Sequence, residues 1–216
     1  MTQSFENSEF MRYRFRSWFD RVGALGDWRD AYREIEDAYR TPPRSYHSFH
    51  GHVAFCIQEL YTIPKGIVER IDEVELALTL HDSRMNFIGK DNESRSASFA
   101  TDLCGRMGLS MPLTERVLRH IISTDHSGSP DDPDSRLVVD IDLAVLGQDE
   151  AAFNEYERAI REEYGFIPED IYRKRRVEVL RRFLERPSVF LSGHFKERYE
   201  KPARTNLETS IERLSR

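Results

Sequence analysis

Cysteine is scarce in this 216-residue sequence, which contains only Cys56 and Cys104. The two form neither a CxxC pair nor the spacing of a thiolate zinc site. Each lies among apolar residues that recur at helical intervals, so we expect buried, reduced thiols of a cytoplasmic protein. No apolar run approaches the ~20 residues that cross a bilayer, and the first residues lack the apolar segment of a signal peptide. The sequence therefore predicts no membrane partner.

Excess positive charge is also missing. The 32 Lys and Arg residues are outnumbered by 38 Asp and Glu residues, and the formal net charge is -6. Proteins that bind nucleic acids usually carry a basic stripe, so we predict no nucleic-acid partner. A small anionic substrate stays compatible with this charge, because a bound metal ion reverses the local sign. The sequence contains no P-loop, dinucleotide fingerprint, G-x-S-x-G elbow or zinc-protease motif.

What the sequence does contain is helical periodicity along almost its whole length. The first apolar stripe is formed by Met11, Phe15, Trp18 and Val22. The segment 137–143 could pass for a strand, but its position among helices favours a buried helix. No internal repeat and no long linker interrupts the pattern. We therefore predict an all-α helical bundle with a single domain over residues 1–216, whose core spans about residues 18–214.

The seven histidines are unevenly distributed. His47, His50 and His52 lie within six residues, and His81 directly precedes Asp82 at the end of an apolar helical stripe. A buried carboxylate beside an imidazole is costly unless a positive group compensates it, as a divalent metal ion does. Imidazole and carboxylate ligands suit a borderline transition metal with open coordination positions. Taken alone, the pair favours a hydrogen-bonded pair at a partly exposed helix end, and the neighbouring histidines and the downstream aspartate shift the interpretation towards a metal site.

Six short motifs follow one another along the chain. They are Arg44–Phe49, Leu78–Asp82, Asp91–Ala97, Asp140–Gly147, Ile160–Tyr164 and Ala203–Leu207. In this order they resemble the motifs of bacterial HD-superfamily proteins known as predicted metal-dependent phosphohydrolases, including "D-N-E-x-x-S-A" and "D-x-D-L-x-x-L-G". The resemblance extends from about Trp18 to Leu214. It implies the helical bundle of the HD domain.

In HD proteins the metal is bound by a first histidine, a His-Asp pair and a later aspartate. The resemblance assigns His81 and Asp82 to the pair. The later aspartate is Asp140 or Asp142, and we prefer Asp142 because Leu143 follows it, as in the family's "D-L" pattern. Asp140 would then contact the metal ligands without binding the metal itself, or it would be a carboxylate at the start of a helix.

The first histidine has three candidates. Related cyclic-nucleotide phosphodiesterases open with "Y-H-N-x-x-H", in which the second histidine binds metal and the first protonates the leaving group. Gly51 stands where that second histidine is expected, so His52 resembles it after the insertion of one residue. We assign His52 as the metal ligand and His47 as the general acid, with His50 as the competitor.

Further residues of the resembling motifs are candidates for catalysis or substrate binding. Glu93 would accept a proton from metal-activated water, although a first-turn glutamate that interacts with a helix dipole is equally compatible. His50, His126 and Arg161 would contact the substrate. The alternatives are a solvated loop residue for His50, a surface histidine for His126, and an internal ion pair for Arg161.

Together these residues predict a hydrolase that cleaves a phosphate ester, with a nucleotide as the implied substrate. The cofactor would be one divalent transition metal, with Mn, Fe, Co, Ni and Zn as the alternatives. Two other functions remain open: a non-catalytic sensor that binds metal or nucleotide, and a diiron oxygenase of the HD type. The oxygenase needs extra histidines after the His-Asp pair, and only His120 and His126 are available. The oligomeric state is also open, with a homo-oligomer among the alternatives.

Overall fold

The computed structural model describes residues 2–216, with side chains from Glu6 onward, and in this range every regular element is a helix. The all-α prediction is confirmed. The elements are α1 (Thr2–Arg21), α2 (Trp28–Ala38), η1 (Phe49–Val53), α3 (Ala54–Leu60), α4 (Ile71–Leu80), α5 (Asn92–Arg106), α6 (Met111–Ser123), α7 (Pro133–Asp142), η2 (Leu143–Gly147), α8 (Glu150–Glu163), α9 (Glu169–Leu184) and α10 (Gly193–Ser215). None of the helices in the described range has both the length and the apolar character needed to cross a membrane.

The first helix forms where the apolar stripe predicts it. In α1, Met11, Phe15 and Trp18 are at most 4% exposed, so one face of the helix packs into the core. At the start of α2, the Asp27 side chain accepts a hydrogen bond from the Arg29 amide at 2.8 Å. Such a cap satisfies one of the amides that a helix N-terminus leaves without a partner.

The ambiguous segment 137–143 is helical for most of its length, as the sequence predicts. It forms the second half of α7, and Leu143 begins the 3₁₀ turn η2. Val138, Val139 and Ile141 are completely buried, because α7 packs against α3, α4 and α6. A helix enclosed by its neighbours is apolar all round, which explains why its sequence resembles a buried strand.

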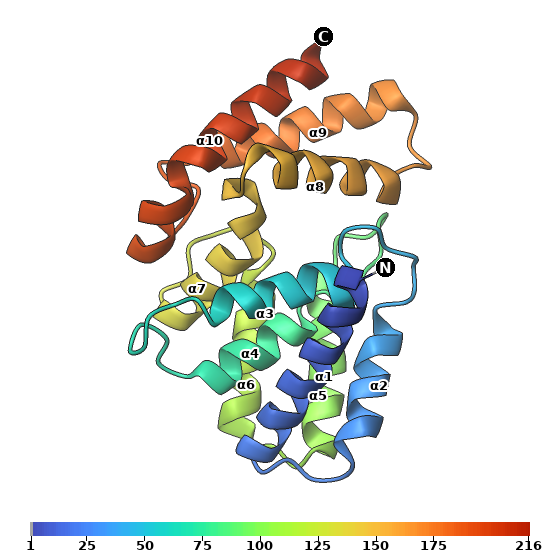
Figure 1. Cartoon of the computed structure of the whole chain (residues 1–216), viewed down its shortest axis with the longest axis vertical. Helices are drawn as coiled ribbons and strands as arrows, with labels where there is room; N and C mark the ends of the chain where they lie inside the picture. Colours follow the sequence, from blue (N-terminus) through green and yellow to red (C-terminus); the bar gives the residue numbers. More distant parts are fainter. Residues whose placement is uncertain (1) are drawn as a thin grey trace.

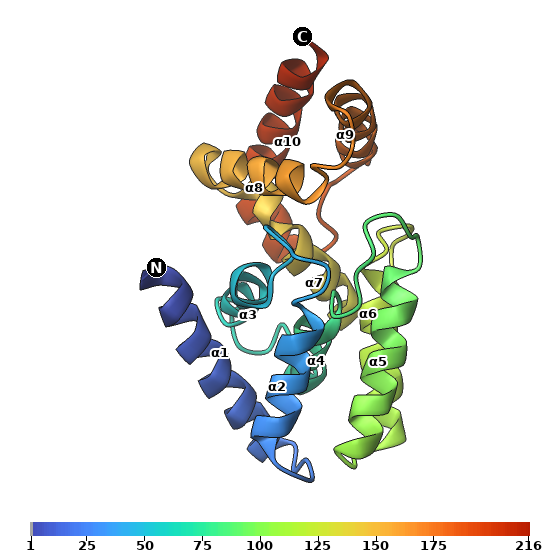
Figure 2. The same cartoon turned by 90° about the vertical axis from the view of Figure 1, so that its right-hand side faces the viewer.

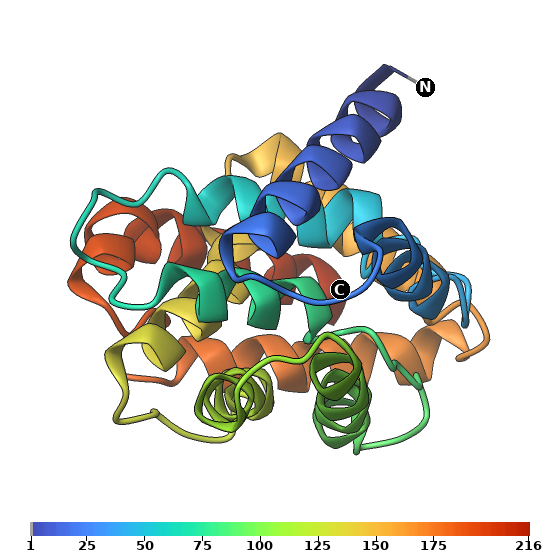
Figure 3. The same cartoon turned by 90° about the horizontal axis from the view of Figure 1, so that it is seen from below.

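The helices form two groups (Figures 1 and 2). Helices α1–α6 lie together in the lower part of the view, where α5 and α6 run side by side (Figure 3). Helices α8–α10 lie above them, and α7 with η2 joins the two groups. One hydrophobic cluster includes side chains from all ten α-helices, from Met11 to Leu207. The two groups therefore share a core.

Candidate metal centre

Three packed segments carry the residues of the predicted metal site. His52 lies in the turn η1, His81 and Asp82 directly follow α4, and Asp142 is the last residue of α7. The turn η1 leads into α3, and α3, α4 and α7 contact one another in the middle of the molecule (Figure 1). Residues about 30 and 60 positions apart in the sequence thus converge on one place, as the helices of a bundle allow.

The backbone around His52 has an unusual form. Residues Phe49–Val53 form a π-helical turn directly before α3. A π turn holds one residue more than an α turn, and such turns occur frequently at functional sites. This geometry accommodates the one-residue insertion beside Gly51 that the resemblance implies. It leaves His52 buried, with only 3% of its surface exposed.

Five of the six pairs among the four candidate ligands are 2.9–3.6 Å apart, close to the separations expected around one cation. His52 Nε2 is 2.9 Å from Asp142 Oδ1 and 3.1 Å from His81 Nε2. His81 Nε2 is 3.1 Å from Asp82 Oδ2 and 3.3 Å from Asp142 Oδ1, while His52 Nε2 is 3.6 Å from Asp82 Oδ2. Ligand atoms ~2.1 Å from a metal ion are about 3.0 Å apart in octahedral and about 3.4 Å apart in tetrahedral geometry. The donor set therefore fits a divalent transition metal.

Hydrogen bonding prepares His81 for this role. Its Nδ1 lies 2.9 Å from the Leu78 carbonyl oxygen, to which it donates. Its Nε2 consequently faces the other ligands, and such an outer hydrogen bond is typical of metal-binding histidines. Burial would lower the pKa of His81, but the charge of Asp82 and the hydrogen bond to Asp142 raise this pKa well above its ordinary value. In the metal-free chain the raised pKa favours a second proton on the His81 ring, at Nε2. A cation that binds Nε2 would displace this proton.

The pKa values of both candidate carboxylate ligands are lowered. Burial would raise the pKa of Asp82, but the charge and the hydrogen bond of His81 hold it well below its ordinary value. Burial would likewise raise the pKa of Asp142, but hydrogen bonds from His126, His52 and His81 keep it well below the usual range. Ionised carboxylates are the form that binds metal ions.

His126 joins the site from an unexpected direction. It has a φ angle of 56°, and its Nε2 lies 2.9 Å from Asp142 Oδ2. The left-handed conformation is uncommon for a residue with a side chain, and such conformations cluster at functional sites. Arg186 Nη2 fixes the loop by donating to the His126 carbonyl at 2.6 Å. His126 thus contacts the candidate ligand Asp142, whereas the sequence suggested either substrate contact or a surface histidine.

Asp140 faces away from this cluster. It is fully buried, and its two carboxylate oxygens accept hydrogen bonds from the Leu191 amide at 2.6 Å and the Ser192 amide at 2.7 Å. It therefore anchors the segment that leads into α10. Of the two aspartates in the "D-x-D-L" motif, Asp142 is the one beside the histidines.

His47 lies next to the cluster and is held by a residue that the sequence analysis did not single out. Glu163, whose side chain is fully buried, accepts hydrogen bonds from the Tyr46 and His47 amides at 2.8 Å each. Its other oxygen lies 2.6 Å from His47 Nδ1. Burial would lower the pKa of His47, but the hydrogen bond to Glu163 and the nearby carboxylates raise it above its ordinary value. Glu163 thus fixes the orientation of the ring and favours its protonated form. Its place in the motif Ile160–Tyr164 was the available sequence signal.

Arg44 ties the His47 segment to the His-Asp pair. Its Nη1 donates to the carbonyl oxygens of His47 at 3.2 Å and Asp82 at 2.5 Å. Its Nη2 donates to the carbonyl oxygens of Ala38 at 3.3 Å and Ser83 at 3.4 Å. A guanidinium group can bridge several carbonyls in this way because its donors have a fixed planar geometry.

A cavity of about 510 Å³ opens beside the cluster. Asp142, His126 and His47 line it on the side of the candidate metal site, and helices α8 and α9 supply the opposite wall. Its volume lies within the range of roughly 300–1,000 Å³ that is typical of small-molecule pockets. The arrangement gives a ligand access to the candidate metal site.

Three of the predicted site residues lie elsewhere and do not line this cavity. His50 places its Nε2 3.0 Å from Glu36 Oε1 and lines a separate hollow. Glu93 lies in the first turn of α5. Arg161 donates to Glu169 Oε2 at 2.8 Å and to two main-chain carbonyls at the end of α8, so its guanidinium group serves an internal network.

Cys56 is an additional neighbour of the candidate metal site. As predicted, it is a buried free thiol. Its Sγ lies 3.8 Å from both ring nitrogens of His52, and its ligand atom falls within 4.8 Å of those of His52 and Asp142. Burial raises the pKa of this thiol well above its ordinary value, so the thiolate form that binds metals is disfavoured without an ion.

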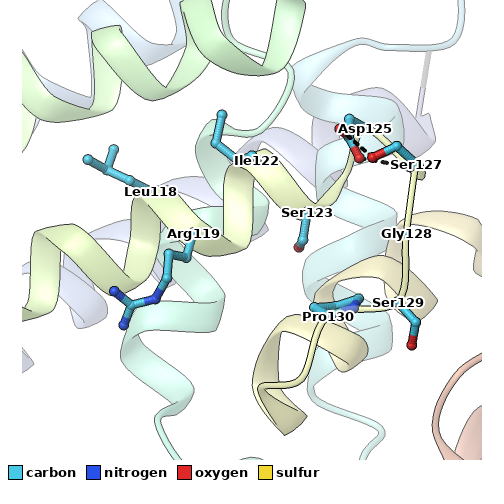
Figure 4. A pocket seen from close by; sticks show the side chains of 9 residues that line it. All are labelled: Leu118, Arg119, Ile122, Ser123, Asp125, Ser127, Gly128, Ser129 and Pro130. Carbon is cyan, nitrogen blue, oxygen red and sulfur yellow. Dashed lines mark hydrogen bonds between the residues drawn. The ribbon is translucent and has the colours of Figure 1, made fainter.

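Another hollow, distinct from the cavity and from the hollow that His50 lines, has a volume of about 440 Å³ and lies at the end of α6 (Figure 4). Its only carboxylate, on Asp125, accepts hydrogen bonds from the amide and the hydroxyl group of Ser127, both at 2.8 Å. None of the histidines lines it. The hollow therefore offers no comparable set of metal ligands.

Comparison of the chain with models of protein families, with curated proteins and with solved structures finds no match.

Proposed function

We propose that this protein is a metal-dependent phosphohydrolase of the HD type, which cleaves a phosphate ester of a small molecule, with a nucleotide as the substrate that the family resemblance implies. One observation carries the proposal: the two imidazoles lie about 3 Å from each other and from two carboxylates, beside a cavity that His47 also lines. The order of these residues in the chain is that of the HD family. The resemblance and the geometry therefore support the same reaction.

His52, His81, Asp82 and Asp142 would hold the metal ion. A bound divalent cation would lower the pKa of a coordinated water molecule and stabilise negative charge on a phosphoryl oxygen. The side chains of Asp82 and Asp142 are 13% and 14% exposed, so the candidate site is largely shielded from bulk solvent. Shielding strengthens the interaction of these residues with a phosphoryl group.

His47 would act as the general acid. Its Nδ1 is bonded to Glu163, so its Nε2 is the nitrogen available to give a proton to the leaving oxygen. An imidazole suits this task near neutral pH. Of the two catalytic candidates from the sequence, His47 lines the cavity and Glu93 does not. We therefore place the proton transfer to the leaving group on His47.

The diiron alternative has less support from the structure. Of the two extra histidines, His126 lies beside Asp142, but His120 places its Nδ1 2.7 Å from Ser135 Oγ and does not line the cavity. One additional imidazole supplies too few ligands for a second metal ion. The sensor alternative uses the same residues, and only an activity measurement separates it from the hydrolase.

The test is to load the purified protein with Mn, Fe, Co, Ni or Zn and to measure phosphate release from a panel of nucleotides and simple phosphate esters. The Asp142→Asn variant should bind metal weakly and lose phosphate release, whereas Asp140→Asn tests the neighbouring aspartate that faces away. Full metal occupancy without phosphate release from any substrate would refute the hydrolase. Tight nucleotide binding under those conditions would favour the sensor.

A further inference from the structure

The cavity beside the candidate metal site carries two cationic side chains at its exposed rim. Lys90 lies in the loop between α4 and α5, and Arg175 lies on α9 in the upper helix group (Figure 2). Both residues are exposed, whereas His81 is only 1% exposed. Because the phosphoryl group to be cleaved must reach the buried cluster, the two cations lie nearer to solvent than that group does.

Aromatic and aliphatic side chains also line the cavity. Phe87 and Tyr164 meet edge to face, with ring centroids 5.3 Å apart, and Tyr172 and Ile167 extend the apolar wall. Such a wall accommodates a flat ring, because aromatic pairs favour stacked and edge-to-face contacts. The lining thus combines metal ligands, an apolar wall and exposed cations.

The charges of the rim cations are not balanced by the cavity itself. Among the described residues that line it, only Asp142, a candidate metal ligand, carries a carboxylate. A third cation, Arg176, is already paired with Glu157 and with the Tyr156 hydroxyl group. Among the side chains that the structure describes, neither Lys90 nor Arg175 forms an ion pair. A ligand with a second anionic group would supply the missing charge.

We propose that the substrate carries two phosphoryl groups on opposite sides of a nucleoside, as in a nucleoside 3′,5′-bisphosphate. This inference rests on the proposed hydrolase function. One phosphoryl group lies at the candidate metal site and is cleaved. The apolar wall contacts the nucleoside, and Lys90 and Arg175 bind the second phosphoryl group at the rim.

The test compares adenosine 3′,5′-bisphosphate with the 5′- and 3′-monophosphates. The binding of each compound is measured by calorimetry in a chelator, where metal-dependent turnover cannot occur. The bisphosphate should bind more tightly, and Lys90→Ala and Arg175→Ala should each weaken its binding by about fivefold, the scale of an exposed ion pair. Lys174→Ala is the matched control, because Lys174 is exposed on the same helix but lines a different hollow.

The metal-loaded enzyme then gives kcat and KM for the same compounds. The rim variants should raise KM for the bisphosphate by a larger factor than KM for the preferred monophosphate. Metal-dependent hydrolysis with no preference for the bisphosphate and no effect of the variants would overturn this inference but leave the proposed function intact. An equal loss for all compounds would place the two cations on the cleaved phosphoryl group and also overturn it. If no compound is hydrolysed, the proposed function fails, and the calorimetry still decides whether the rim binds a second phosphoryl group.

Discussion

Replacing Glu163 by glutamine tests the role assigned to His47. Glutamine keeps one oxygen for the Tyr46 and His47 amides, which both bond to the same oxygen of Glu163. It replaces the other oxygen, 2.6 Å from His47 Nδ1, by an amide group that cannot accept a hydrogen bond. The Glu163→Gln variant should therefore keep the local fold but lose the charged partner of the imidazole.

The magnitude follows from the loss of one hydrogen bond to a charged group in a largely buried place. Such a bond stabilises the protonated ring by about 2 kcal/mol, so its loss lowers the pKa of His47. The sign is clear, because Glu163 raises the pKa of His47 in the native protein and its removal lowers it. At a pH above both pKa values, kcat should fall by about 30-fold, since the protonated fraction falls by that factor.

The assays are the pH dependence of kcat with a saturating metal and substrate, and an NMR titration of the His47 ring. The basic limb of the kcat profile should move to lower pH in Glu163→Gln. Glu162→Gln is the matched control, because Glu162 is the exposed neighbour on the same helix. An unchanged basic limb and an unchanged titration of His47 would refute the assignment of Glu163 as its positioning residue.

Three further predictions follow from the geometry. The Asp82→Asn variant should bind divalent metal ions more than about 100-fold more weakly, because it loses a charged ligand, and equilibrium dialysis would show it; wild-type affinity would contradict the ligand assignment. Metal binding at neutral pH should release about one proton, because His81 holds one in the metal-free chain, and calorimetry in buffers of different ionisation enthalpy measures this release. Gly147→Ala should lower the free energy of unfolding by about 2 kcal/mol, because its Cβ would lie 2.5 Å from Tyr199 Cβ, and the melting temperature should fall by about 4–8 °C. A variant as stable as the wild type would show that η2 and α10 can separate without cost.

The sequence was most informative where a residue's role follows from its immediate neighbours. The helical stripe of α1 depends on the spacing of Met11, Phe15 and Trp18, and the structure confirms it. The grouping of His81 with Asp82 needs only adjacency, and the order of the histidines and aspartates was readable because the chain order does not change on folding.

Other residue assignments depended on the orientation of a side chain in the folded protein. The choice among His47, His50 and His52 depended on a π turn, because one additional residue there rotates every following side chain to a new direction. The same applies to Asp140 and Asp142, which are two residues apart on α7 and therefore face different partners.

The sequence by itself determined the all-α class and the set of candidate ligands, because helical periodicity and residue identity are local properties. Only the tertiary structure brought Glu163 to His47 and Arg44 to Asp82, across separations of 116 and 38 residues. It also formed the cavity between the two helix groups and left His50 and Arg161 outside it. Such contacts arise from the packing of whole helices, whose relative orientation depends on all the core side chains together and is not specified by any short stretch of sequence.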